Sequence, residues 1–211
     1  MPLVRLEYIN ADCCWALWEI NEPAEELIYV LQPTTDDLAH LHLIGHEQKR
    51  MEWLASRLAV RCLLQHWDFS YLGIRKNEWN QPLLNAYPFQ VSLSHTARHG
   101  AAILHRHEKV GIDIEHCQDK IIRIRHKFLS AEEMKEAGEQ LEKLTVYWCA
   151  KEALYKIYAR KQLHFNKHIR ISPFDFQLEG KISGRIVRDQ PLQHYQITYL
   201  HHDLLTVAYA Y

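Results

Sequence analysis

Apolar residues recur at helical spacing in two long stretches of the chain, at about 46–67 and about 144–161. Residues three and four positions apart lie on one side of an α-helix, so each stretch predicts a long helix with one buried face. In the second stretch, the apolar face consists of Tyr147, Ala150, Leu154 and Ile157. Another helix is predicted to begin at Ser130, because Glu133 follows it at the spacing of a capping box.

Shorter apolar segments predict β-strands around these helices. The segments VSLSH (91–95) and GAAILHR (100–106) form a pair joined by a short turn, and KVGIDIE (109–115) follows them. The runs LEYI and CCWALWEI open the chain, and the C-terminal part adds DFQLEG, GRIVRD, HYQITYL and LLTVAYAY. This mixture of helices and paired strands predicts an α+β protein with small, mostly antiparallel sheets.

The two halves of the chain share one order of predicted elements, a long helix followed by a closing pair of strands. The segments VSLSHTARHGAAILH and ITYLHHDLLTVAYA are alike as strand, polar turn and strand. The chain has no Pro/Gly/Ser-rich linker, so we expect short connections within a compact protein. The similarity of the halves indicates an internal duplication.

Composition and charge exclude several functional classes. The formal net charge of −1 does not favour a nucleic-acid partner, which requires a concentrated basic face. No apolar run approaches the length of a membrane span, and the first residues lack the pattern of a secretory signal, so we expect a cytoplasmic protein without membrane contact. The five cysteines and fifteen histidines lack the spacing of a zinc site, and the Rossmann and P-loop glycine motifs are absent.

The segment KVGIDIE places two carboxylates on one face of a predicted strand. Asp113 and Glu115 alternate with apolar Ile112 and Ile114, and two residues along a strand put the carboxylates roughly 6–7 Å apart. A divalent cation can lie between them, and Mg²⁺ prefers such oxygen ligands. The alternative is an edge strand with a solvated acidic face.

The predicted helix at 144–161 contains the segment WCAKEALYK. Its residues Trp148, Glu152 and Lys156 follow one another at four-residue spacing, on a face different from the apolar one. Taken alone, the pair Glu152 and Lys156 is typical of an ordinary surface ion pair. Taken with Asp113, Glu152 is a further acidic group for a metal site, and Lys156 would face an anion held there.

Two further features suit anion binding. Ser94 and His95 end a predicted strand at a turn, where a hydroxyl and an imidazole can both donate hydrogen bonds to phosphate. Arg50 and Arg57 lie seven residues apart and thus two turns along one helix, where they form an anion clamp or are simply solvated.

Together, these segments resemble the 4′-phosphopantetheinyl transferase superfamily. VGIDIE followed by WCAKEALYK is similar to the family signature (V/I)G(I/V)D-x-E and W-x-x-K-E-(A/S)-x-x-K. Upstream, KRMEWLASRLA, NEWNQPLL and VSLSHTARHG look like the family's basic helix, its G-K-P segment and its N-(I/L)-S-H-(S/T) turn. The resemblance covers about residues 47–160.

The chain length matches the larger, surfactin-synthetase-activating (Sfp-like) type of this family. That type implies two similar α/β subdomains forming a pseudo-dimer within one chain, each with a long helix on a small sheet. We expect an N-terminal subdomain at 1–108, a C-terminal subdomain at 109–211 and an active site between them. A monomer is expected.

The resemblance implies transfer of the phosphopantetheine arm of coenzyme A to a serine of an apo acyl or peptidyl carrier protein, releasing adenosine 3′,5′-bisphosphate. Which kind of carrier protein is modified does not follow from the sequence. The implied metal ligands for Mg²⁺ are Asp113, Glu115 and Glu152. The implied catalytic residues are Asp113, Glu152 as the acceptor of the serine proton, and Lys156. The residues implied to bind the coenzyme phosphates are Arg50, Arg57, Ser94, His95 and Lys156.

The chain departs from the family pattern in two places, and the role of one matching residue is open. Asn80-Gln81-Pro82 replaces G-K-P, which predicts weaker coenzyme A binding or compensation by Arg50, Arg57 or Arg75. Ser92 replaces the usual asparagine of the N-(I/L)-S-H turn, a minor change. Lys151 belongs to the signature without a role that the residues reveal, and contact with the coenzyme or with an acidic carrier is considered for it.

Two alternatives compete with an active transferase. A non-catalytic homologue that binds coenzyme A or a carrier protein is compatible with the altered Gln81, although Asp113, Glu152 and Lys156 are intact. A metal-dependent nuclease also uses separated acidic residues and a lysine, but the chain lacks the usual E-x-K dyad and a basic character.

Overall fold

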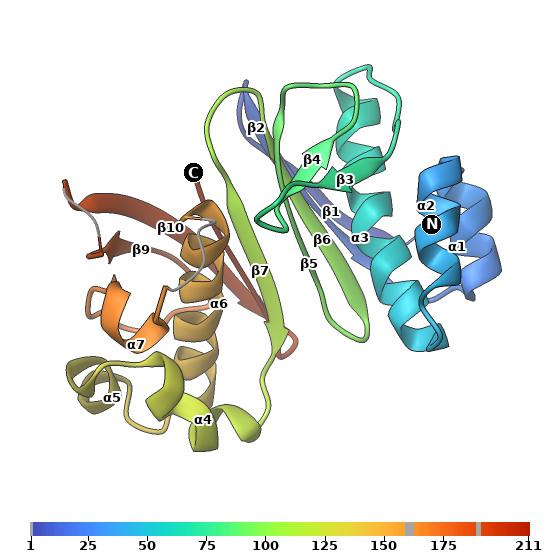
Figure 1. Cartoon of the computed structure of the whole chain (residues 1–211). Coiled ribbons are helices and arrows are strands. Elements are labelled where there is room, and N and C mark those ends of the chain that lie inside the picture. Colours follow the sequence, from blue (N-terminus) through green and yellow to red (C-terminus); the bar gives the residue numbers. More distant parts are fainter. Residues whose placement is uncertain (1, 159–162, 189–190) are drawn as a thin grey trace. The chain divides into compact units, whose positions relative to one another are not determined.

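The computed structural model describes residues 2–158, 163–188 and 191–211. The chain forms two compact units, Met1–Val110 and Gly111–Tyr211, and Figure 1 shows the elements of each. Both units combine helices with antiparallel strands. The predicted α+β class is therefore confirmed. Within the described residues, no helix has the length and apolar character needed to cross a membrane.

The first unit is a four-stranded antiparallel sheet with one long helix against it. The strands occur in the order β1-β2-β6-β5, and helix α3 lies along the sheet (Figure 1). A short hairpin, β3-β4, and helices α1 and α2 complete the unit. Its elements are β1 (Leu3–Asn10), β2 (Cys13–Glu19), α1 (Ala24–Leu31), α2 (Thr35–His42), α3 (Glu47–His66), β3 (Ile74–Lys76), β4 (Pro82–Leu84), β5 (Gln90–His95) and β6 (His99–His105).

The second unit is a five-stranded antiparallel sheet, again with one long helix against it. The strands occur in the order β7-β11-β10-β9-β8, and helix α6 packs mainly on β7 and β11 (Figure 1). Its elements are β7 (Gly111–His116), α4 (Lys120–Phe128), α5 (Ala131–Ala137), α6 (Leu141–Tyr158), α7 (Phe165–His168), β8 (Ile169–Ile171), β9 (Glu179–Ile186), β10 (Gln193–His202) and β11 (Leu205–Ala210).

The two units share a topological core. In each, the strand before the long helix pairs antiparallel with the last strand, and that strand pairs with the one before it in a closing hairpin. The pairs are β2 with β6 and β6 with β5 in the first unit, and β7 with β11 and β11 with β10 in the second. The predicted order of a long helix followed by a closing pair of strands is thus present in both units, and the structure adds a preceding strand that pairs with the hairpin in each.

Glycine allows both long helices to approach their sheets closely. A Cβ on Gly100 would lie 2.4 Å from backbone atoms of Ala55 and Ser56 in α3, and a Cβ on Gly111 would lie 2.0 Å from the carbonyl oxygen of Ala153 in α6. No larger residue fits at either place without moving the helix. Gly111 thereby fixes the separation of β7 and α6, the two elements that carry the predicted metal ligands.

Most predicted elements are present with small shifts at their ends. Helix α3 begins and ends within one residue of the prediction, and α6 begins three residues earlier, while 159–161 lie outside the described residues. The capping box of Ser130 and Glu133 is confirmed. The prediction of separate strands at DFQLEG and GRIVRD is wrong, because a single strand, β9, runs through the position between them and 175–178 form no strand.

We predict that Gly111→Ala lowers the free energy of unfolding by about 3 kcal/mol, the upper end of the usual cost of overpacking. The added methyl would collide with the backbone of α6 rather than with a flexible side chain. Urea denaturation followed by circular dichroism measures the effect. Gly45→Ala is the control, because no atom lies within 4 Å of the position that its Cβ would take. Equal stability of the two variants would contradict the proposed packing.

Candidate active site

Strand β7 and helix α6 bring Asp113 and Lys156 into direct contact. The Lys156 ammonium donates one hydrogen bond to Asp113 Oδ1 at 2.8 Å and another to the carbonyl oxygen of Ile112 at 2.7 Å. Asp113 is buried, whereas the Lys156 side chain is about one quarter exposed. The ordinary surface pair between Glu152 and Lys156 is not formed among the described residues. Lys156 instead joins the helix to the strand.

Glu152, on the same helix as Lys156, has a carboxyl group with a strongly raised pKa. Burial raises its pKa to about 7, with a further increase from the negative charges of Asp113 and Glu115 and a decrease from Lys156. Within the described part of the chain, no hydrogen bond or ion pair is made by the Glu152 side chain. A half-buried carboxylate without a partner lowers the stability of the fold. Such carboxylates are common at sites that bind a ligand or transfer a proton.

Glu115 lies near the same cluster. Burial raises its pKa and Asp113 raises it further, whereas Lys120 and the backbone N–H of His116 lower it. That N–H donates to Glu115 Oε1 at 3.1 Å. The electrostatic influence of Asp113 on Glu115, and of both on Glu152, indicates that negative charge is concentrated between β7 and α6.

This charge distribution bears on the predicted Mg²⁺ ligands. Among the described residues, no group of three or more His, Cys, Asp or Glu side chains is arranged to hold a metal ion. The donors are nonetheless all carboxylate oxygens, which suit Mg²⁺. Their mutual repulsion is what a bound cation would relieve, so the residue types fit a magnesium ion, and its binding stays a prediction.

Lys151, the neighbour of Glu152, points into the interior instead. Its side chain is fully buried, and its ammonium donates to Glu133 Oε2 at 2.6 Å and to the carbonyl oxygens of Ile169 at 2.8 Å and Phe165 at 3.2 Å. Burial lowers its pKa to about 8, against the opposing effect of Glu133. The considered contact of Lys151 with a coenzyme or carrier is therefore wrong, because no part of its side chain reaches the surface.

Glu133 is the partner that the sequence revealed only as part of a capping box. Its carboxylate also accepts hydrogen bonds from the backbone N–H of Ser130 and of Ile171, both at 2.8 Å. It thereby joins α5, α6 and β8. No sequence signal connects Glu133 to Lys151, because eighteen positions separate them and neither belongs to a common motif.

The apolar face of α6 packs as predicted. Its members Tyr147, Ala150, Leu154 and Ile157 all belong to the core of the second unit. Trp148 lies on another side, edge-on to Phe128 and stacked on Phe165, with ring centroids 5.2 and 5.9 Å apart. The aromatic residue of the signature thus holds α6 against α4 and α7, rather than facing a ligand.

In the first unit, His95 is held by a carboxylate that no sequence pattern indicated. Its Nδ1 lies 2.9 Å from Glu52 Oε2 of helix α3, and Lys49 Nζ lies 2.6 Å from the same oxygen. Glu52 is buried, whereas the His95 side chain is 45% exposed. Ser94 is buried on the same strand. The buried carboxylate therefore orients an accessible imidazole.

The two predicted arginines of α3 lie in different environments. The Arg57 guanidinium is buried 3.4 Å from the centre of the Trp53 ring, donates to the Trp53 carbonyl oxygen at 3.2 Å and lies 4.0 Å from Asp37 Oδ1. Burial lowers the pKa of Arg57 to about 10. Arg50 is only partly buried, and among the described residues its Nε has no hydrogen-bond partner. The two arginines thus have different neighbours, and their predicted role in anion binding stays a prediction.

The altered Asn80-Gln81 segment forms the turn between β3 and β4. Asn80 has a positive φ of 63°, a conformation that glycine or asparagine adopts most readily, so asparagine suits the place where the family pattern has glycine. The Gln81 Oε1 accepts a hydrogen bond from Asn77 Nδ2 at 3.0 Å. Gln81 therefore stabilises its own turn, where the family pattern has a cation.

Residues 109–210 match the model of the family described as the 4′-phosphopantetheinyl transferase superfamily. The match covers β7 and α6, and thus Asp113, Glu115, Glu152 and Lys156. The resemblance found in the sequence is confirmed for this superfamily domain, which supports a transferase acting in phosphopantetheine transfer. The larger, Sfp-like type stays a prediction. None of the curated proteins matches the chain.

We predict that Lys151→Met lowers the free energy of unfolding by about 3–5 kcal/mol, because it leaves the Glu133 carboxylate buried without its cation. Equilibrium urea denaturation provides the measurement. Lys135→Met is the matched control, since Lys135 is an exposed lysine of α5. If Lys151→Met is as stable as the control, the interior role of Lys151 is wrong.

Proposed function

We propose that the protein transfers 4′-phosphopantetheine from coenzyme A to a serine hydroxyl of an apo acyl or peptidyl carrier protein. The observation that carries this proposal is the unpartnered Glu152 carboxylate, with a pKa near 7, beside the bonded pair Asp113 and Lys156. These residues lie within the superfamily domain. A carboxylate that gains and loses a proton near neutral pH suits the removal of a proton from serine.

The reaction requires the serine oxygen to attack a phosphorus of the pyrophosphate, which adds negative charge to oxygens that are already anionic. Bound between Asp113, Glu115 and Glu152, Mg²⁺ would supply a cation that neutralises this charge. Glu152 accepts the serine proton. Because the Glu152 side chain has no internal partner among the described residues, one carboxylate oxygen would be available to the cation and the other to the serine proton.

Lys156 contributes in two ways. Its hydrogen bond to Asp113 holds the aspartate in one orientation, and its hydrogen bond to the Ile112 carbonyl oxygen fixes the ammonium group beside β7. The quarter of its side chain that is exposed offers a cation to a phosphate oxygen of the substrate. A lysine that both orients an acid and contacts phosphate needs no large movement between these roles.

The coenzyme phosphates are assigned to residues of the first unit, as the sequence predicts, with Ser94 retained beside His95 and Arg57 left out. His95, oriented by Glu52, and Arg50, whose buried Nε lacks a partner in the described part of the chain, are the proposed anion contacts. Arg57 already donates within the first unit, so we no longer include it. Arg75 is exposed and is the other basic residue available to compensate for Gln81.

The shared topology of the two units supports the pseudo-dimeric, Sfp-like type. A single duplicated element would account for the same strand, long helix and hairpin in both halves. The smaller type of this family has roughly half this length. We therefore propose that one chain supplies both halves and that the enzyme is a monomer.

The proposed carrier is an acidic protein, and helix α4 offers a basic surface for it. This helix has no acidic residue, and its exposed cations include Arg123 and Lys127. Its first residue, Lys120, lowers the pKa of Glu115 and so lies near the carboxylate cluster. Opposite charges of this kind favour association in the required orientation.

The catalytic test is incubation of the protein with coenzyme A, Mg²⁺ and a panel of apo fatty-acid, polyketide and nonribosomal-peptide carriers, followed by mass spectrometry. We expect at least one carrier to gain phosphopantetheine. Asp113→Ala and Glu152→Ala should each lower the rate by at least about 100-fold, since each removes a metal ligand or the base. Arg123→Glu should raise the KM for the carrier without changing the KM for coenzyme A.

Circular dichroism of each variant, recorded alongside the transfer assay, shows whether the variant is folded. A panel in which no carrier is modified, while a transferase of known activity modifies them all, contradicts the proposed reaction. Coenzyme A binding without transfer would then identify a non-catalytic homologue. Full activity of Glu152→Ala would exclude Glu152 as the base.

A second prediction concerns the titration of Glu152. In the metal-free protein, its carboxyl should titrate near pH 7, and Asp113→Asn should lower this pKa because it removes a negative charge that raises it and releases Lys156. The chemical shift of the Glu152 side-chain carboxyl carbon, followed by NMR against pH, measures both values.

In the same titration, Glu139→Gln is the control, since Glu139 is an exposed glutamate that pairs with Arg125. It should leave the pKa of Glu152 unchanged. The proposal predicts that Mg²⁺ lowers the apparent pKa of Glu152 in the unmodified protein. An ordinary carboxyl pKa in the metal-free protein would remove the observation on which the function rests.

A further inference from the structure

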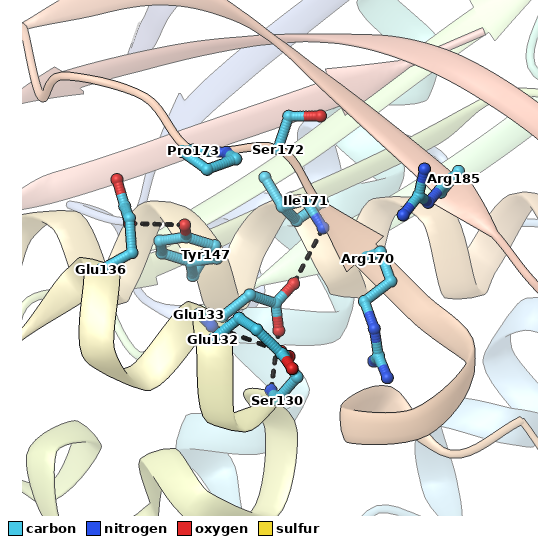
Figure 2. A pocket seen from close by; sticks show the side chains of 10 residues that line it. All are labelled: Ser130, Glu132, Glu133, Glu136, Tyr147, Arg170, Ile171, Ser172, Pro173 and Arg185. Carbon is cyan, nitrogen blue, oxygen red and sulfur yellow. Dashed lines mark hydrogen bonds between the residues drawn. The ribbon is translucent and has the colours of Figure 1, made fainter.

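A pocket of about 400 Å³ lies in the second unit, apart from the residues assigned to transfer. Residues of α5, α6, β8 and β9, with the segment that follows β8, form its walls (Figure 2). None of Asp113, Glu115, Glu152 and Lys156 lines it. Its volume is within the range of sites for small molecules. The pocket has no function in the proposed reaction.

Two of the acidic residues in the pocket are fully engaged by the protein. Glu133 accepts from Lys151 and from two backbone N–H groups. Glu136 accepts from Lys143 at 2.6 Å, from the Tyr147 hydroxyl at 2.6 Å and from the backbone N–H of Phe174 at 3.2 Å. Because each carboxylate is matched by a lysine, neither contributes net charge to a ligand.

The remaining cations of the pocket are two arginines on neighbouring strands. Arg170 of β8 and Arg185 of β9 are directly opposite each other in the antiparallel register. Like charges in this relation are destabilising unless an anion separates them. Arg170 uses Nη1 for the carbonyl oxygen of Asn166 at 2.7 Å, and among the described residues the Arg185 side chain makes no hydrogen bond or ion pair.

The opposite side of the pocket is acidic. Glu132 accepts a hydrogen bond from the Ser130 hydroxyl at 2.8 Å. That bond, its own backbone N–H and the charge of Arg170 lower the pKa of Glu132, so it is ionised at neutral pH. Figure 2 shows Glu132 and Ser130 on the helical side of the pocket and the two arginines on the strand side. The pocket therefore has a cationic side and an anionic side.

We propose that this pocket binds a small phosphate monoester that also carries an amine, with the phosphate at Arg170 and Arg185 and the ammonium group at Glu132. The planar guanidinium group matches two phosphate oxygens at once, and a dianion between the two arginines relieves their repulsion. The Ser172 hydroxyl, in the same wall, is a further donor. The ammonium group pairs with the one carboxylate of the pocket that no lysine balances.

The test is an NMR titration of the full chain with O-phosphoethanolamine, inorganic phosphate and ethanolamine, followed at the backbone amides of Ile171 and Ser172. We expect saturable shifts with the first two compounds and at least about threefold tighter binding of O-phosphoethanolamine, from one exposed ion pair. Shifts near Arg50 and His95 are recorded separately, because phosphate is also expected there. This readout is independent of transferase activity.

Three variants distinguish the contacts. Arg185→Gln should weaken both phosphate compounds by about tenfold through loss of a charged hydrogen-bond donor. Glu132→Gln should remove the advantage of O-phosphoethanolamine over phosphate. Lys181→Gln is the control, since Lys181 is an exposed cation of β9 that does not line the pocket, and it should change neither affinity.

The inference is overturned if the Ile171 and Ser172 amides show no saturable shift, or if Arg185→Gln binds as the unmodified protein does. It is equally overturned if O-phosphoethanolamine binds no more tightly than phosphate. Arg185 and Glu132 are both exposed, so neither substitution is expected to prevent folding. Circular dichroism of each variant confirms that a loss of binding is not a loss of structure.

Discussion

The buried ion pair between Lys151 and Glu133 determines the arrangement of the second unit. An ammonium group in the interior requires a carboxylate and further acceptors, and here α5, α7 and β8 supply them. Because successive helical residues are turned by about 100°, an inward Lys151 directs the next residue, Glu152, to another side of α6. The same Glu133 carboxylate also holds Ile171 in the wall of the arginine-lined pocket. One interaction thus orients the proposed base and shapes a second site.

In the second unit, the hydrogen bonds of a carboxylate indicate whether it stabilises the fold or is available for chemistry. Glu133 and Glu136 are each matched by a lysine and by backbone N–H groups, and for Glu136 these bonds outweigh burial and lower its pKa. Glu152 is desolvated without such compensation, and its pKa rises. A fold gains nothing in stability from a carboxylate of the second kind. The presence of Glu152 on α6 is therefore best explained by chemistry.

The sequence predicted the features that depend on local pattern. Helices α3 and α6, the closing hairpins and the capping box at Ser130 follow from residue spacing within short segments. The association of VGIDIE with WCAKEALYK came instead from the resemblance to a family signature. The short helices α1, α2 and α4 were not predicted, because two turns of helix carry too little periodicity. The prediction of a strand at DFQLEG was wrong. Apolar residues alternate there, but Phe176 packs against Tyr199 from a segment that pairs with no strand. The partners of Lys151 and His95 lie far along the chain, where spacing carries no information.

The two arginines of α3 show why the remaining site residues could not be assigned from the sequence alone. Arg50 and Arg57 are seven positions apart on α3, and periodicity places them on the same side. Nevertheless, Arg57 is buried against Trp53 and Asp37, whereas Arg50 is only partly buried, and the Nε of each lacks a hydrogen-bond partner among the described residues. The difference arises from α2 and from the ring of Trp53, which cover only one end of this side. Helical phase defines a direction, but the neighbours that tertiary packing places there decide whether an arginine stabilises the fold or remains available to an anion.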